Sequence, residues 1–192
     1  MYGARWPEFF ELPKLMIRDL TGTHRLETAL DLDGYYCDHT VLCALRRVDV
    51  AQWKPLKDGE EDVSANYDIR FLAGVVGSTV VSAYSYLVLS GEGVRTGGGF
   101  HTYPQSIRAL PVPRLDTTNE AQMKQAEAIA NHVERLAEAK QKSRLAKSDK
   151  DKAFHATQAQ SLDFKIDELV AEMFGLSPSE TAIADRLANG SD

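Results

Sequence analysis

Histidine, cysteine and carboxylate side chains are the first candidates for chemistry in this chain of 192 residues. The histidines are scattered along the sequence, and neither a nucleophile elbow nor a paired-histidine helix motif surrounds any of them. Most carboxylates lie in charged runs that are typical of solvated surfaces. We therefore expect no catalytic residues and no active site of the chain's own.

The two cysteines, Cys37 and Cys43, cannot build a disulfide framework. Asp38 and His39 lie beside them and could join them around a metal ion. A structural zinc site, however, needs four ligands in closely spaced pairs, and the sequence has no second pair. The prediction is two half-buried, unbridged thiols in a reducing cytoplasm, with neither a metal nor a cofactor bound by this chain.

A glycine-rich run, residues 91–99, contains five glycines and cannot hold regular structure cheaply. Its spacing matches neither the dinucleotide-binding nor the kinase glycine pattern, and no Gly-Lys-Ser/Thr follows it. A nucleotide-phosphate site is therefore not expected. The run instead predicts a loop, or a surface that another molecule can approach closely.

The charge of the chain is unevenly spread. Lys and Arg total 22 against 28 Asp and Glu, and the net charge of −6 taken alone argues against nonspecific binding to nucleic acid or anionic membrane. Residues 49–68 carry −4 and residues 163–192 carry −5, which leaves +3 for the rest. The acidity therefore lies in two segments, and the remainder is mildly basic.

No apolar run approaches the ~20 residues that a membrane helix requires. Residues 1–11 mix charged and aromatic side chains and do not resemble a signal peptide. We expect a cytoplasmic protein with no membrane partner.

The first part of the chain is expected to contain β-structure. Leu12 to Ile17 form a short apolar segment, and Pro13 within it favours an edge strand. Turns are predicted at residues 21–23 and 31–34, a buried strand at 40–45, and a solvent-exposed loop at 54–66.

The apolar stretch 69–89 is ambiguous between helix and strand. Asp68 and Ser78 could cap two helices separated at Gly77, whereas the β-branched residues 79–81 favour a strand. Residues 111–113 then predict an extended exit, because two prolines flank Val112.

The C-terminal part predicts three helices. Thr117 and Glu120 form a capping box for the first, which runs to about Ala146, and the charged residues 147–152 separate it from the second. The second ends at Gly175, and another capping box begins the last helix at Ser177. The fold class is α+β, with a β-containing domain at 1–116 and a long helical hairpin region at 117–192.

Four stretches resemble the TaqI-like C-terminal specificity domain, the target-recognition domain of type II restriction-modification enzymes and N6-adenine DNA methyltransferases. They are similar to its opening strand (10–18), its leucine-rich helix followed by Gly-Ser (69–78), its Leu-Pro-x-Pro segment (97–113) and its Ile-Asp-Glu-Leu-Val ending (166–176). The resemblance covers roughly residues 10–188 and supports the two-helix interpretation of 69–89. Phe174 stands where the family usually has Tyr, and residues 54–66 have no counterpart.

The resemblance implies a sequence-specific DNA recognition domain that is not itself an enzyme. The family's catalytic part is missing, so S-adenosylmethionine is expected only in an attached or partner methyltransferase or endonuclease. The partners implied are double-stranded DNA and that catalytic domain or subunit, with the hairpin as spacer and docking surface. The alternatives are a type I-like specificity subunit and a helical protein-interaction scaffold without DNA binding.

On this interpretation, side chains that reach base edges and cations that hold phosphates carry the function. The basic remainder around the glycine-rich run favours DNA binding, and the overall charge favours the scaffold. The candidate DNA-binding residues are Lys14, Arg18, Arg25, Arg46, Arg47, Arg95, Thr96, Gly98, His101, Tyr103 and Gln105.

Overall fold

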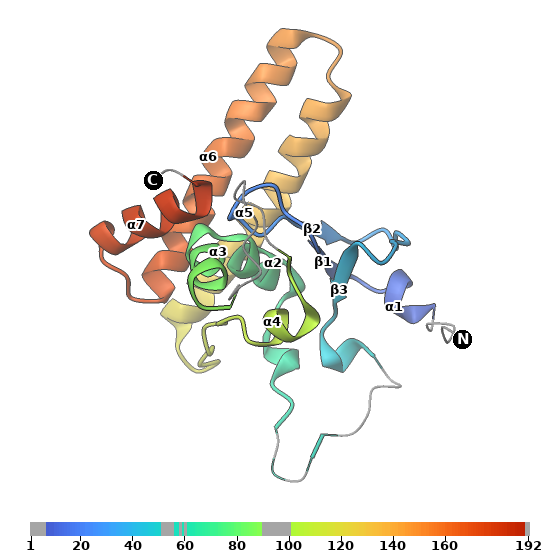
Figure 1. Cartoon of the computed structure of the whole chain (residues 1–192), viewed down its shortest axis with the longest axis vertical. Coiled ribbons are helices and arrows are strands. Elements are labelled where there is room, and N and C mark those ends of the chain that lie inside the picture. The colour runs from blue at the N-terminus through green and yellow to red at the C-terminus, as the bar shows by residue number, and fades with distance from the viewer. Residues whose placement is uncertain (1–6, 51–55, 58, 60, 90–100, 191–192) are drawn as a thin grey trace.

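The structure is a computed structural model that describes residues 7–50, 56–57, 59, 61–89 and 101–190. It combines a small antiparallel sheet with a largely helical C-terminal part, so the α+β prediction holds at that coarse level (Figure 1). The elements in chain order are α1 (Glu8–Glu11), β1 (Lys14–Arg18), β2 (Thr28–Asp31), β3 (Val41–Ala44), the 3-10 helices η1 (Arg47–Asp49) and η2 (Ser64–Asn66), α2 (Ile69–Gly77), α3 (Thr79–Tyr84), the π-helical η3 (Ser85–Leu89), α4 (Pro104–Arg108), α5 (Glu120–Leu145), α6 (Asp149–Met173) and α7 (Pro178–Asn189).

The sheet has the strand order β2-β1-β3, with both pairings antiparallel. The predicted edge strand is therefore wrong, because β1 lies in the centre. Pro13 precedes the first paired residue, Lys14, so its missing N–H leaves the ladder intact. Leu15 and Ile17 are buried in the core, and this burial favours a central position.

β3 lies within the predicted strand at 40–45, but its residues are half-buried. It is an edge strand of this sheet, which explains its partial exposure. The turn predicted at 31–34 is confirmed: Gly34 has φ +80°, and the Asp31 carboxylate accepts hydrogen bonds from the backbone N–H groups of Asp33, Gly34 and Tyr35.

The ambiguous stretch 69–89 is helical. The Asp68 carboxylate accepts from the N–H of Arg70 at the start of α2, and the Ser78 hydroxyl accepts from the N–H of Val81 at the start of α3. The β-branched residues 79–81 do not form a strand, because this cap satisfies an N–H of the helix and Thr79 and Val81 are buried.

The predicted helical hairpin is formed by α5 and α6. The first helix does not use the capping box predicted at Thr117: Asn119 accepts from the N–H of Gln122, and α5 begins at Glu120. Asn119 is as good a capping residue as Thr117 and lies two residues later, so α5 begins after Asn119 and Thr117 lies outside the helix. The predicted charged break is also shorter, because Ser148 caps α6 and residues 149–152 are helical.

The predicted end of α6 and the predicted start of α7 are confirmed. Gly175 has φ +69°, and the N–H of Leu176 donates to the carbonyl of Ala171 at 3.0 Å, which closes the glycine motif. Ser177 and Glu180 form both hydrogen bonds of a capping box at the start of α7.

One hydrophobic core joins the sheet, α2 and the hairpin. It contains Ile17 of β1, Val75 of α2, Ile129 of α5 and Val170 of α6, among others. The predicted boundary between residues 116 and 117 therefore does not separate two cores. A smaller cluster, Ala139, Ala159 and Leu162, continues along the hairpin, which projects away from the sheet and α4 (Figure 1).

No single helix within the described ranges is long and apolar enough to cross a membrane. Taken together, α2 and residues 79–89 are long and apolar enough to cross a membrane by length and composition, but the two helices meet at a bend of 55°. Much of this pair is buried in the core just described.

Candidate nucleic-acid interface

The candidate interface lies where the described chain resumes at His101. Leu20 and His101 form an antiparallel bridge, and the N–H of Thr102 donates to the carbonyl of Asp19 at 2.6 Å. These bonds hold residues 101–102 beside the end of β1. Thr102 is buried there, and it fixes the start of the segment that leads into α4.

Three of the predicted residues follow one another on this segment. The ring of His101 stacks on that of Tyr103 with centroids 5.9 Å apart, and its Nδ1 atom lies 3.4 Å from Oδ1 of Asp19. Tyr103 is 47% exposed, and Gln105 is exposed on the first turn of α4. The structure thus brings together an imidazole, a phenol and an amide, with two of these side chains open to solvent.

Arg18 ends β1 next to Asp19 and is an accessible cation. Its guanidinium donates to Glu27 at 2.7 Å, with 61% of the Arg18 side chain exposed. An exposed pair of this kind contributes ~0–1 kcal/mol, so a phosphate could replace Glu27 at low cost. Arg108, at the last residue of α4, is a second exposed cation here, and the sequence-based candidates did not include it.

Lys14 is a correction to the predicted site. Its side chain is fully buried, and its ammonium group pairs with Asp31 and donates to the carbonyl of Phe10. Burial raises the pKa of Asp31, but the bonds from Lys14 and from the backbone of Asp33 and Tyr35 outweigh it and hold the pKa below its ordinary value. A contact with phosphate would leave Asp31 buried and unpaired, so Lys14 is removed from the interface.

Arg25 connects separate parts of the core instead of facing a ligand. Its Nε donates to the carbonyl of Gly77 at 3.1 Å, and its two terminal nitrogens lie 2.8 Å from Asp163 and 3.4 Å from Asp167. Its side chain is 24% exposed. Arg25 therefore ties the end of α2 to α6.

Arg46 and Arg47 are held by nearby carboxylates. Arg46 forms two bonds of 2.7 Å with Asp49 and a third, of 2.9 Å, with the carbonyl of Tyr67. Arg47 lies 3.5 Å from Asp62. Both side chains are less than one third exposed. The remaining predicted residues, Arg95, Thr96 and Gly98, lie outside the described residues.

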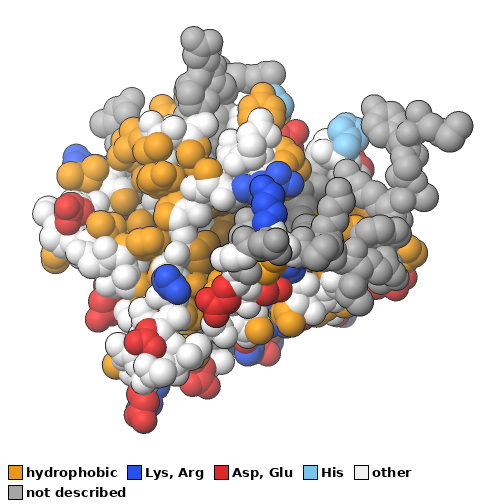
Figure 2. Space-filling view, turned by 90° about the horizontal axis from the view of Figure 1, so that it is seen from below, with side chains coloured by type: hydrophobic (Ala, Val, Ile, Leu, Met, Phe, Trp, Pro, Cys, Tyr) orange, Lys and Arg blue, Asp and Glu red, His pale blue; other side chains and the backbone are white. Residues whose placement is uncertain are grey.

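The face seen in Figure 2 is poor in positive charge. Hydrophobic side chains gather on one side of it, and Lys and Arg are few. Tyr84, Leu87 and Val88, at the end of α3 and on η3, are among the exposed apolar side chains of the chain.

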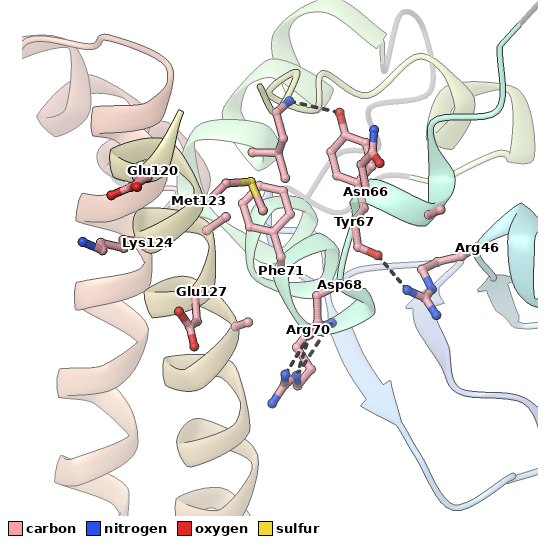
Figure 3. A pocket seen from close by; sticks show the side chains of 14 residues that line it. Arg46, Asn66, Tyr67, Asp68, Arg70, Phe71, Glu120, Met123, Lys124 and Glu127 are labelled. Carbon is pink, nitrogen blue, oxygen red and sulfur yellow. Dashed lines mark hydrogen bonds and ion pairs between the residues drawn. The ribbon is translucent and has the colours of Figure 1, made fainter. Parts of the chain in front are cut away.

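A groove of about 590 Å³ lies between η2, α2 and the start of α5 (Figure 3). Arg70, one of its charged groups, is already paired, because it lies 2.7 Å from Asp68 and 2.7 Å from Glu134. Asp68 holds the pKa of Arg70 above its ordinary value, and Glu134 adds to this effect. We therefore assign these ion pairs to the stability of the fold, because no nucleophile lies beside a base among the residues that line the groove.

Asp167 is a buried carboxylate that the sequence-based site did not include. Its Oδ1 accepts from the N–H of Thr79, the first residue of α3, at 2.8 Å. Burial raises the pKa of Asp167 to about 6, although Arg25 and the Thr79 bond oppose this change. Asp167 belongs to the Ile-Asp-Glu-Leu-Val stretch, and its contacts give that stretch a structural role.

Cys37 and Cys43 are half-buried, as predicted. The Sγ atoms of Cys37 and Cys43 lie 3.1 Å apart, which is longer than the ~2.05 Å of a disulfide bond. Among the residues that the structure describes, no group of three or more His, Cys, Asp or Glu side chains could hold a metal ion.

No protein-family model matches this chain, and a search of curated proteins finds no match either.

Proposed function

We propose that this chain is a sequence-specific DNA recognition domain that directs an N6-adenine DNA methyltransferase or a restriction-modification enzyme to its target. The observation that carries the proposal is the position of His101, Tyr103 and Gln105 on a segment that is bridged to the chain just beyond Arg18, the last residue of the central strand. We refer to these four residues as the reading site.

The reading site has the chemistry that base recognition requires. The amide of Gln105 can form paired hydrogen bonds with adenine, and the phenol of Tyr103 can donate to an acceptor on a base edge. Arg18 is suited to a phosphate, because exchanging its exposed partner Glu27 costs little. The bridge between Leu20 and His101, with the hydrogen bond from the N–H of Thr102 to Asp19, anchors the segment, so its side chains are presented from fixed backbone.

On this proposal the chain selects the site and another domain performs the reaction. A methyltransferase partner supplies S-adenosylmethionine and takes the flipped adenine into its own pocket. The hairpin acts as a spacer and as a docking surface for that partner.

A protein-interaction scaffold without DNA binding is the alternative. It is favoured by the net charge of −6 and by the exposed apolar side chains at the end of α3 and on η3. A type I-like specificity subunit differs from the main proposal only in its partners, because the hairpin would then bind modification and restriction subunits.

A gel-shift series with random and selected duplexes at two salt concentrations tests the proposal. We expect binding that prefers one sequence and weakens as salt rises. Gln105→Ala should relax the preference at one base pair by ~1–3 kcal/mol, whereas Arg18→Ala should weaken binding equally for all sequences. Failure of the chain to bind any duplex at low salt, with or without a methyltransferase partner, would favour the scaffold.

A further inference from the structure

The positive charge of this chain is concentrated at the far end of the helical hairpin. Residues 140–158, which we call the hairpin tip, carry six Lys or Arg and two Asp, a net charge of +4. The remaining residues together carry −10. Outside the two acidic segments 49–68 and 163–192 the chain carries +3, of which the tip contributes +4 and all other residues −1. The positive charge that the sequence led us to expect around the glycine-rich run therefore lies at the hairpin tip.

The cations of the tip are open to solvent. All six are exposed, and within the described part of the chain Lys142 alone forms an ion pair, with Glu138 at 3.2 Å. The two acids lie in the first turn of α6, near the positive end of the helix, and Asp151 accepts a hydrogen bond from the Ser148 hydroxyl there. They therefore neutralise the lysines only in part.

A groove of about 530 Å³ extends this positive surface toward the body of the molecule. Its lining includes Arg135, Lys150 and Lys165, the exposed ring of Phe154 and no carboxylate. His132 lies near the same cations: burial lowers its pKa, and the charges of Arg135 and Lys165 lower it further.

The tip protrudes far enough to follow a duplex. Val133 is the last buried α5 residue of the main core, and the helix continues to Leu145, about 18 Å further at 1.5 Å per residue. Duplex DNA carries one phosphate charge per ~1.7 Å of its axis, so a stretch of duplex of this length carries about ten phosphates on its two strands. Six cations without a full set of acidic partners suit that density.

We infer that the hairpin tip is a phosphate clamp that binds the backbone of duplex DNA independently of sequence. This inference rests on the proposed function, and it supplies what the reading site lacks. Exposed cations near that site are few, namely Arg18, which is paired with Glu27, and Arg108, while Arg25 and Arg46 lie elsewhere and are held within the protein. Phosphate contacts provide most of the affinity of a DNA-binding protein, so the chain reads bases at one place and holds the backbone at another.

The test uses the full chain with the substitutions Lys140→Glu, Lys147→Glu and Lys150→Glu together. The matched control carries Arg114→Glu, Lys124→Glu and Arg186→Glu, which change the net charge equally at exposed positions outside the tip. Binding to a selected duplex and to a random duplex is measured from 50 to 300 mM salt by fluorescence anisotropy. Thermal unfolding verifies that both variants are folded.

The tip variant should lose about tenfold or more in affinity for both duplexes at 100 mM salt, and its slope of log K against log salt should fall by about 2 to 3. The control should retain most of its affinity. Equal losses in the two variants, or an unchanged tip variant, would overturn the clamp.

The outcomes separate the clamp from the proposed function. Binding that lacks sequence preference but depends on the tip supports the clamp and overturns sequence recognition. Sequence-selective binding that survives the tip substitutions does the reverse. The clamp is rejected if the wild-type chain binds neither duplex. It is also rejected if the tip substitutions change only self-association, measured by sedimentation. The tip would then bind an acidic surface of a second copy of this chain.

Discussion

Burial decides what each charged residue of this chain does. Lys14 and Arg18 begin and end the same strand, yet Lys14 pairs with Asp31 in the interior and Arg18 is exposed at the surface. Sequence reasoning assigned both to phosphate, because a strand of five residues does not reveal which charge has a partner 17 residues away. The same limit applied to Arg25, whose partners in α6 lie more than 130 residues along the chain.

The link between Arg25 and α6 should contribute to stability. Arg25→Ala removes two ion pairs and a hydrogen bond to Gly77 and leaves Asp167 buried without a cation, so we expect a loss of ~2–4 kcal/mol in the free energy of unfolding. Arg18→Ala removes an exposed pair and should change it by less than ~1 kcal/mol. Urea unfolding at neutral pH measures both, and similar losses would contradict the assigned roles.

Asp167 should make stability depend on pH. Its pKa in the folded chain is about 6, above the ordinary aspartate value, so the folded state binds the proton more tightly than the unfolded state. Its contribution is therefore fully present below about pH 4 and is lost as pH rises through 6. Asp167→Asn keeps an oxygen for the Thr79 N–H and does not titrate.

Relative to Asp167→Asn, the wild-type chain should lose up to ~3 kcal/mol between pH 4 and pH 7. Unfolding of both proteins across that range gives the difference, in which the other titrating groups cancel. A difference that stays constant with pH, or that changes in the opposite direction, would show that Arg25 keeps Asp167 ionised.

Helix boundaries were more predictable from sequence than strand positions. Asp68, Ser78, Ser177 and Gly175 act on N–H and carbonyl groups within a few residues, and each begins or ends a helix as expected. The capping box at Thr117 failed because Asn119 competes with it within the same turn. The central position of β1 was missed because strand order depends on partners elsewhere in the chain.

Gly74 of α2 lies where this helix packs tightly against α5. A Cβ atom built there would lie 2.6 Å from Cγ2 of Ile129 and 3.0 Å from Cγ2 of Val133, both on α5. Gly74→Ala should therefore destabilise the fold by ~1–3 kcal/mol, although alanine favours helices. Gly22→Ala is the control, because a Cβ there meets nothing within 4 Å. Thermal unfolding of the two variants should show a lower Tm for Gly74→Ala alone.

At the scale of the whole molecule, the site could be predicted only in part. His101, Tyr103 and Gln105 were selected from the sequence, but their position beside the end of β1 depends on contacts across 82 residues. The charge of the tip is visible in the sequence, whereas its exposure on a projecting hairpin is a property of the fold.

The shared core predicts that the two halves of the chain do not fold separately. Residues 1–116 would expose Phe71 and Val75, and residues 117–192 would expose Ile129 and Val170. Each fragment alone should show weak chemical-shift dispersion, and mixing them should restore part of the native spectrum. A well-dispersed spectrum from the 1–116 fragment would show that the β-containing half is an independent domain.

The fit of α2 against α5 also limits how this chain could be recombined with a relative. A chimera joined at residue 116 would set one parent's Ile129 and Val133 against the other parent's α2, where a single added methyl group already causes a clash. Grafting residues 103–108 would exchange exposed side chains of the reading site and keep Gly74 with its own partners. Under the proposed function, we therefore expect a short surface graft to transfer specificity and an exchange of half of the protein to fail.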